Sequence, residues 1–249
     1  MLVVLIAWAY LVFLQISMAR GDMSLMGGTS VPMSGVAAMA PAPWNVMSSV
    51  LTFLMWWVMM VGMMIPSSLP AILLFRRVQH HYRKNERPGL YVFAFVGGYL
   101  IAWGAFSAAA TAAQLGLGSA GLMSQMTMSV GTPIAVALFA AGGIYQLSPL
   151  KHACLRHCRS PADFIAAHQR PGLAGALRTG AFHGIYCVGC CWLLMALLFV
   201  GGVMNLFWVA GLAVFVLIEK VAPAGHWFAR ASGVTMLVIS VLMAAQLIG

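Results

Sequence analysis

Long apolar segments alternate with short polar segments over almost the whole chain. Most of the apolar segments have the roughly 17 to 25 residues that a helix needs to cross about 30 Å of hydrocarbon. The ten-residue alternation typical of a membrane β-barrel is absent from the sequence. The pattern predicts an all-α, polytopic integral membrane helix bundle that forms one domain, residues 1–249. The seven transmembrane helices that we expect cover residues 2–18, 48–74, 90–113, 132–149, 180–200, 206–222 and 231–248.

The composition agrees with a membrane protein. Of the 249 residues 62% are hydrophobic and only 7% are charged, and the mean hydropathy is +0.95. Ordinary soluble domains carry about 25% charged residues, so this chain has too few polar side chains to cover one soluble core. A single soluble domain is therefore excluded.

The basic residues are distributed unevenly between the predicted connections. All lysines and arginines except Arg20 lie in or beside the second, fourth and sixth connections. Positive charge stays on the cytoplasmic side of a membrane, so we expect the amino terminus inside and the carboxyl terminus outside. This topology, with anionic lipid at the inner surface, explains the net charge of +9 without a nucleic-acid partner. The first span lacks a basic segment before it, which favours a retained helix over a cleaved signal peptide.

A predicted external loop, residues 20–47, contains methionines among glycine, serine and proline. They are Met23, Met26, Met33, Met39 and Met47. A loop in water has no packing reason to be rich in methionine, and two interpretations stay open. The thioethers rest on the lipid surface or on a neighbouring helix, or the loop is a mobile shell that captures a soft ion.

A second set of methionines, which we call the methionine ladder, lies within the second predicted span. It consists of Met55, Met59, Met60, Met63 and Met64. Side chains four residues apart lie above one another on a helix, and thioethers are soft ligands that favour Cu(I). Methionine is also a common gap-filler in cores, so packing is the alternative interpretation. Pro66 and Pro70 follow the ladder, and prolines in membrane helices often accompany a functional site.

All cysteines fall in two short motifs, LKHACLRHCRSP and HGIYCVGCCWLLM. They are Cys154, Cys158, Cys187, Cys190 and Cys191. Spacings of three and four residues place both thiols of a pair on one helix face, where they can share one ion. The first motif belongs to a basic cytoplasmic loop that we expect over residues 150–179. C-x-x-C suits metal binding and thiol exchange equally, and His183, one turn before Cys187, is a further candidate ligand.

Glu219 is one of four acidic residues in the chain and lies near the inner end of the sixth predicted span. An acid at membrane depth is usually partnered and functional. Either it forms an ion pair with an arginine of a loop, or it serves as a metal ligand or proton acceptor. We expect its neighbour Lys220 to be an anchor that extends toward the membrane surface.

Four motifs follow one another from about residue 48 onward: MWWVMMVGMMIPSS, YQLSPLKHACLRHCRSP, HGIYCVGCCWLLM and GVMNLFWVAGLAVFVLIEK. In this order they resemble an uncharacterised bacterial family of predicted metal-binding integral membrane proteins. The resemblance implies, without assigning roles, that the following residues matter: Met55, Met59, Met63, Met64, Pro66, Cys154, Cys158, Cys187, Cys190, Cys191 and Glu219. Eukaryotic copper uptake transporters are similar only in their chemistry, with external methionines, an M-x-x-x-M helix and inner cysteines.

The favoured function is the binding, and transfer or movement, of a soft metal ion, with Cu(I) as the first choice and zinc as the alternative. The external methionines would acquire the ion, the ladder would relay it, and the cysteines would hold it near the cytoplasm. One rival is a membrane thiol-disulfide oxidoreductase with Cys187 and Cys190 as its active pair and Cys154 and Cys158 as a resolving pair. The other is an accessory subunit of a larger membrane copper enzyme, packed against that partner or in a homo-oligomer. An enzyme is the less favoured class, and the sequence lacks the usual hydrolase motifs.

Overall fold

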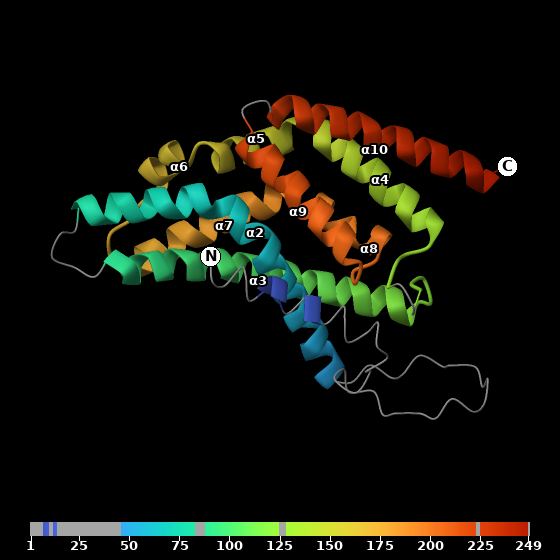
Figure 1. Cartoon of the computed structure of the whole chain (residues 1–249), viewed down its shortest axis with the longest axis horizontal. Coiled ribbons are helices and arrows are strands. Elements are labelled where there is room, and N and C mark those ends of the chain that lie inside the picture. Colours follow the sequence, from blue (N-terminus) through green and yellow to red (C-terminus); the bar gives the residue numbers. More distant parts are fainter. Residues whose placement is uncertain are drawn as a thin grey trace.

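The computed structural model describes residues 7–9, 12–13, 46–82, 88–124, 128–222 and 225–248, and in these residues the only secondary structure besides helices is an isolated bridge between Met123 and Val130. The all-helical expectation is confirmed. Figure 1 shows the long helices α2, α3 and α7 packed together, and α4 and α10 as a second pair. The helices are α2 Val46–Tyr82, α3 Pro88–Ser119, α4 Thr132–Leu147, α5 Pro149–Arg159, α6 Pro161–His168, α7 Gly172–Ala196, α8 Leu198–Gly201, α9 Leu206–Val221 and α10 Gly225–Ile248.

Four segments are long and apolar enough to cross a membrane: Val46–His81, Pro88–Ser119, Gly172–Gly201 and Gly225–Leu247. A fifth span results if α4 and α5, which meet at 66°, are counted as one broken span. α4 and α9 have 16 residues each, and a helix of that length, about 24 Å, is shorter than the hydrocarbon layer. The structure therefore supports four or five spans, and the expected seven are not confirmed. Most of the expected span 2–18 and of the loop 20–47 lies outside the described residues.

The helix that carries the methionine ladder is not straight. Pro66 and Pro70 lie inside α2, and Figure 1 shows that α2 changes direction partway along its length. A proline leaves the carbonyl four residues earlier without its helical donor. The carbonyl freed by Pro66 is that of Gly62, and Trp8 Nε1 donates to it at 3.3 Å. The bend is therefore stabilised by a residue from the start of the chain.

Glycines allow α3 and α7 to pack closely. A Cβ added to Gly98 of α3 would overlap the carbonyl of Leu177, and one added to Gly180 of α7 would overlap the carbonyl of Phe95. A Cβ on Gly184 would also come too close to α3. Small residues at such positions are the usual means by which membrane helices approach each other. They hold α7, with its three cysteines, firmly against α3.

The chain turns sharply between α4 and α5, at the start of the segment expected to be a basic loop. Pro149 is the first residue of α5, and Ser148 caps it by accepting a hydrogen bond from Lys151 N at 3.2 Å. Proline is well suited to the first position of a helix, where no backbone donor is needed. The expected loop 150–179 is thus wrong in its conformation, because it contains α5, α6 and the first turns of α7.

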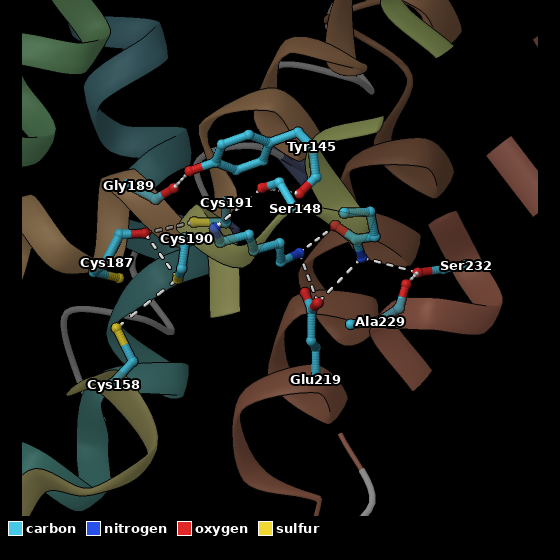
Figure 2. Close-up of polar contacts among 12 residues, drawn as sticks. Tyr145, Ser148, Cys158, Cys187, Gly189, Cys190, Cys191, Glu219, Ala229 and Ser232 are labelled. Carbon is cyan, nitrogen blue, oxygen red and sulfur yellow. Dashed lines mark hydrogen bonds and ion pairs between the residues drawn. The ribbon is translucent and has the colours of Figure 1, made fainter. Parts of the chain in front are cut away.

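A buried ion pair holds α5 against α9. Lys151 Nζ lies 2.6 Å from Glu219 Oε1, and their side chains are 0% and 2% exposed. Gln146 of α4 accepts a hydrogen bond from Lys151 and donates to Glu219 at 3.1 Å and to Ser232 of α10 at 2.8 Å. Arg159 donates a hydrogen bond, at 2.6 Å, to the carbonyl of Ala222, the C-cap residue of α9. Figure 2 shows the contacts around Glu219 and Ser232 beside the cysteines.

We expect Gly180→Ala to destabilise the protein by about 1 to 3 kcal/mol, because the added methyl group must push α7 away from α3. The matched control is Gly116→Ala, also in a helix of this pair, where an added Cβ meets nothing within 4 Å. The control should be neutral or slightly stabilising. Thermal unfolding in detergent measures both variants, and an unchanged midpoint for Gly180→Ala would contradict the close packing.

We expect Lys151→Met to cost about 3 to 5 kcal/mol, since it leaves the Glu219 carboxylate buried without its counter-charge. The double variant Lys151→Met/Glu219→Gln should recover most of that loss, because it buries no charge. Equilibrium unfolding of the single and double variants tests this. Equal stability of the two would show that the ion pair does not hold α5 in place.

Candidate metal centre

The methionine ladder lies entirely inside the bundle. Its side chains are between 0% and 5% exposed, although α2 has many exposed apolar residues on its other face. The ladder belongs to the same core cluster as the cysteines of α7. Met47, at the start of α2, is 65% exposed, and the remaining methionines of the expected external loop lie outside the described residues.

The three cysteines of α7 are buried beside one another. Cys187, Cys190 and Cys191 are each 1% exposed. Cys190 Sγ and Cys191 Sγ both donate to the Cys187 carbonyl, at 3.1 and 2.9 Å. The spacing C-x-x-C-C therefore places these thiols around one turn of α7, and all three are free thiols.

The cysteines of α5 reach the same part of α7. Cys158 Sγ lies 3.8 Å from Cys190 Sγ, as Figure 2 shows. Cys154 Sγ lies against Gly189, where an added Cβ would be only 3.1 Å from the sulfur. Tyr145 of α4 donates a hydrogen bond to the Gly189 carbonyl. Both α5 cysteines are partly exposed, whereas those of α7 are not.

The methionine ladder and the cysteines meet at Met64. Cys191 Sγ donates to Met64 Sδ at 4.0 Å, although the two residues are 127 positions apart in sequence. We call the group formed by these contacts the sulfur cluster. It consists of Met64, Cys158, Cys187, Cys190 and Cys191.

A buried lysine lies at the edge of the sulfur cluster. Lys220 Nζ of α9 donates to Cys187 Sγ at 2.9 Å and to Ser67 Oγ of α2 at 3.3 Å. The Tyr99 hydroxyl of α3 lies 3.1 Å from the same Cys187 sulfur and donates to the Met64 carbonyl, also at 3.1 Å. The expectation that Lys220 extends toward the membrane surface is wrong, because its side chain packs inward against a thiol.

Sequence reasoning missed Lys220, Tyr99 and Ser67 as parts of this site. A charged residue in an otherwise apolar helix is a signal that could have identified Lys220 as part of a site. A lysine at the end of a span, however, usually extends to the membrane surface. Glu219 and Lys220 are adjacent and point to different neighbours. Glu219 binds Lys151 and Gln146, so it has the ion pair expected as one alternative, with a lysine of α5 in place of an arginine.

His183 is buried one turn before Cys187. It is 2% exposed, and its ring lies among those of Phe95, Tyr99 and Phe164, with centroids 5.2 to 5.9 Å away. Its Nδ1 has no hydrogen-bond partner among the described residues. Its candidate role as a ligand stays a prediction.

The distances between sulfurs suit a shared soft ion. A metal–thiolate bond is about 2.3 Å long. Two sulfurs bound to one ion are therefore about 3.8 Å apart when the sulfur–metal–sulfur angle is tetrahedral and about 4.6 Å apart when it is linear. The pairs Cys158–Cys190 and Cys191–Met64, at 3.8 and 4.0 Å, both fall in this range. In the described part of the chain, no group of three or more His, Cys, Asp or Glu side chains is arranged to hold a metal ion. The two close sulfur pairs are the contacts of this site that an ion with few, soft ligands could use.

Comparison with known proteins supplies a family. No curated protein and no solved structure was found to match the chain. A family model described as PpoB2, copper chaperone, matches residues 53–243, a range that includes the whole sulfur cluster, Lys220 and the ion pair of α5. The resemblance to a metal-related family is thus confirmed, and the function is related to copper. The chain belongs to the PpoB2 copper chaperone family.

Proposed function

We propose that this protein binds Cu(I) in the sulfur cluster and hands it on by exchange of soft ligands. The observation that carries the proposal is the pair of sulfur contacts between helices, Cys158 with Cys190 at 3.8 Å and Cys191 with Met64 at 4.0 Å. Three different helices contribute these sulfurs, and thiolates and thioethers together select Cu(I). Zinc remains the alternative ion, with thiolate and imidazole ligands.

The ladder provides a route to the cluster in this proposal. Its buried thioethers lie on one helix and end at Met64, which contacts a thiol. Thioethers bind Cu(I) less strongly than thiolates do, so transfer from methionine to cysteine is downhill. The external methionines at residues 23–47 would acquire the ion first.

The cysteines of α5 provide the way out. Cys158 is partly exposed and contacts the fully buried Cys190, and Cys154 is partly exposed beside it on the adjacent turn. An acceptor thiol can approach α5 and replace one protein ligand at a time. We propose Glu219 as a residue that positions α5 rather than as a ligand, because Lys151 and Gln146 already bind its carboxylate.

We place the chain in the bacterial inner membrane as one transmembrane domain, residues 1–249, with the lipid bilayer as its solvent. The distribution of basic residues supports an inner amino terminus, an outer carboxyl terminus and an α5 that faces the cytoplasm. Transfer of copper to a larger membrane enzyme, as an accessory subunit, is compatible with the same chemistry.

Copper content tests the proposal. We expect the reduced protein, purified in detergent and supplied with Cu(I), to hold copper, and Cys158→Ser and Cys190→Ser to weaken the binding at least roughly 10- to 100-fold, as loss of even an outer partner does at metal sites. Met64→Leu should weaken it less, because a thioether is the weaker ligand. Competition with a chromophoric Cu(I) chelator gives the affinities, and mass spectrometry gives the metal content.

The control for Met64→Leu is Met236→Leu, which replaces another buried methionine, on α10, 8% exposed and outside the sulfur cluster. It should bind Cu(I) as the wild type does. Equal and negligible copper in the wild type and in both cysteine variants would remove the proposal. Loss of copper in Met236→Leu alone would show that packing, not ligation, sets the affinity.

Oxidation gives a second test. The reagent diamide accepts two hydrogens from two thiols and leaves one disulfide, and we expect it to join Cys158 to Cys190 because their sulfurs are 3.8 Å apart. The oxidised protein should lose its Cu(I) affinity and regain it after reduction, since thiolates are the ligands. Peptide mapping identifies the disulfide. A disulfide already present and exchanging with substrate thiols in the purified wild type would favour the oxidoreductase instead.

A further inference from the structure

Lys220 brings a positive charge into direct contact with the sulfur cluster. Its side chain is 7% exposed, and its ammonium group donates to Cys187 Sγ at 2.9 Å. Its other described partner is the neutral hydroxyl of Ser67, at 3.3 Å. A lysine buried among apolar residues is costly unless an anion is close.

The nearby carboxylate is already paired. Glu219 is the neighbour of Lys220 in sequence, but it binds Lys151 at 2.6 Å. The Lys151–Glu219 pair is neutral as a whole. Among the described residues, the group in contact with the Lys220 ammonium that can carry a compensating charge is Cys187, as a thiolate.

We propose that Lys220 sets the net charge that the sulfur cluster accepts, and thereby makes the site select a monovalent soft ion over a divalent one. This inference rests on the proposed function, since it concerns the same cluster. Lys220 is a positioning residue in this role: it binds a ligand sulfur and does not itself bind the metal.

A count of charges gives the selectivity. Two thiolates around Cu(I) carry a net charge of −1, and the ammonium group of Lys220 brings the total to zero. Two thiolates around Zn(II) are neutral, so the same ammonium group would be left buried and unpaired. The count is made for two thiolates because the close contact between thiol sulfurs is a pair, Cys158 with Cys190.

Loading of the cluster is a ligand exchange in which no electrons move. Cu(I) arrives bound to a donor thiolate. A bond forms between the ion and the Cys187 thiolate, and a second forms as a neighbouring thiol of the sulfur cluster gives up its proton. The bond to the donor breaks, and the donor thiolate leaves with that proton. The cluster gains the positive charge of Cu(I) and loses that of one proton. The buried site therefore has the same net charge before and after loading.

Two variants of Lys220 test the inference. Lys220→Gln removes the charge without adding a sulfur, whereas Lys220→Arg keeps the charge. We expect Lys220→Gln to weaken Cu(I) binding by about 10- to 100-fold, the range expected for loss of one charged hydrogen bond. Zn(II) binding should stay the same or become tighter. Lys220→Arg should keep the preference of the wild type for Cu(I).

The measurement is the ratio of the Cu(I) and Zn(II) dissociation constants of the full-length protein in detergent, each obtained with a chromophoric chelator at one pH. Thermal unfolding shows whether each variant is folded, and Lys220→Leu replaces Lys220→Gln if the latter is not. A purely structural role would weaken both metals together. An unchanged ratio in a folded, uncharged variant, or the same loss of preference in Lys220→Arg, would overturn the inference.

The same measurement separates this inference from the proposed function. A wild type that binds Cu(I) strongly, beside an uncharged Lys220 variant with an unchanged metal preference, leaves the copper site standing and removes the role of Lys220. A wild type that binds no Cu(I) removes both.

Discussion

A buried lysine needs a partner, and this requirement determines how the helices around the thiols are arranged. Lys151 of α5 binds Glu219, and Lys220 of α9 binds Cys187. Adjacent residues point about 100° apart around a helix. At the end of α9, Glu219 therefore contacts α5 and Lys220 contacts α7. Separation of either helix from α9 would leave a charge in an apolar interior, at a cost of several kcal/mol. The ionic contacts thereby hold the two cysteine-bearing helices in one place.

Close approach of the helix backbones is the second requirement. α7 uses Gly180 and Gly184 to pack against α3, and Gly189 to admit the Cys154 sulfur of α5. Without Cβ atoms at these positions, two different neighbours can approach α7 closely. Van der Waals contact is a main source of helix association in lipid. The glycines thus allow α3 and α5 to approach the cysteines, and the Lys151–Glu219 ion pair and the Lys220–Cys187 hydrogen bond orient the helices around them.

Much of this arrangement could be predicted from local sequence. The lengths of the apolar segments indicated an all-helical bundle, and the cysteine spacings indicated thiols gathered on helix faces. Methionines four residues apart indicated a common position, and they are indeed buried together. These predictions depend on the period of a helix, which the sequence carries directly. The same reasoning gave seven spans, because hydropathy alone does not distinguish a 16-residue helix from one that crosses the membrane.

The rest depended on contacts between distant residues. Cys191 and Met64 are 127 positions apart, and Lys220 is 33 positions from Cys187. No local pattern indicates which side of α9 faces α7, and a lysine at the end of an apolar helix normally extends to the membrane surface. Pro149 was visible in the sequence, but the partner of Lys151 on α9, 68 positions away, was not. The gathering of the cysteines was therefore predictable, whereas the contacts that Lys220, Tyr99 and Ser67 make beside them were not.

A metal chaperone must hold an ion and also release it, and the charges around the thiols affect both. A cluster of buried thiolates without a counter-charge would be strongly anionic in a low dielectric and would bind any available cation. In the proposed mechanism the ammonium group of Lys220 would reduce that field, so affinity would depend more on the match between soft ligands and a soft ion. The partly exposed thiols of α5 would then allow ligands to be replaced one at a time. Retention would depend on the buried cysteines of α7 and release on the partly exposed cysteines of α5, and the contact between Cys158 and Cys190 would link the two functions.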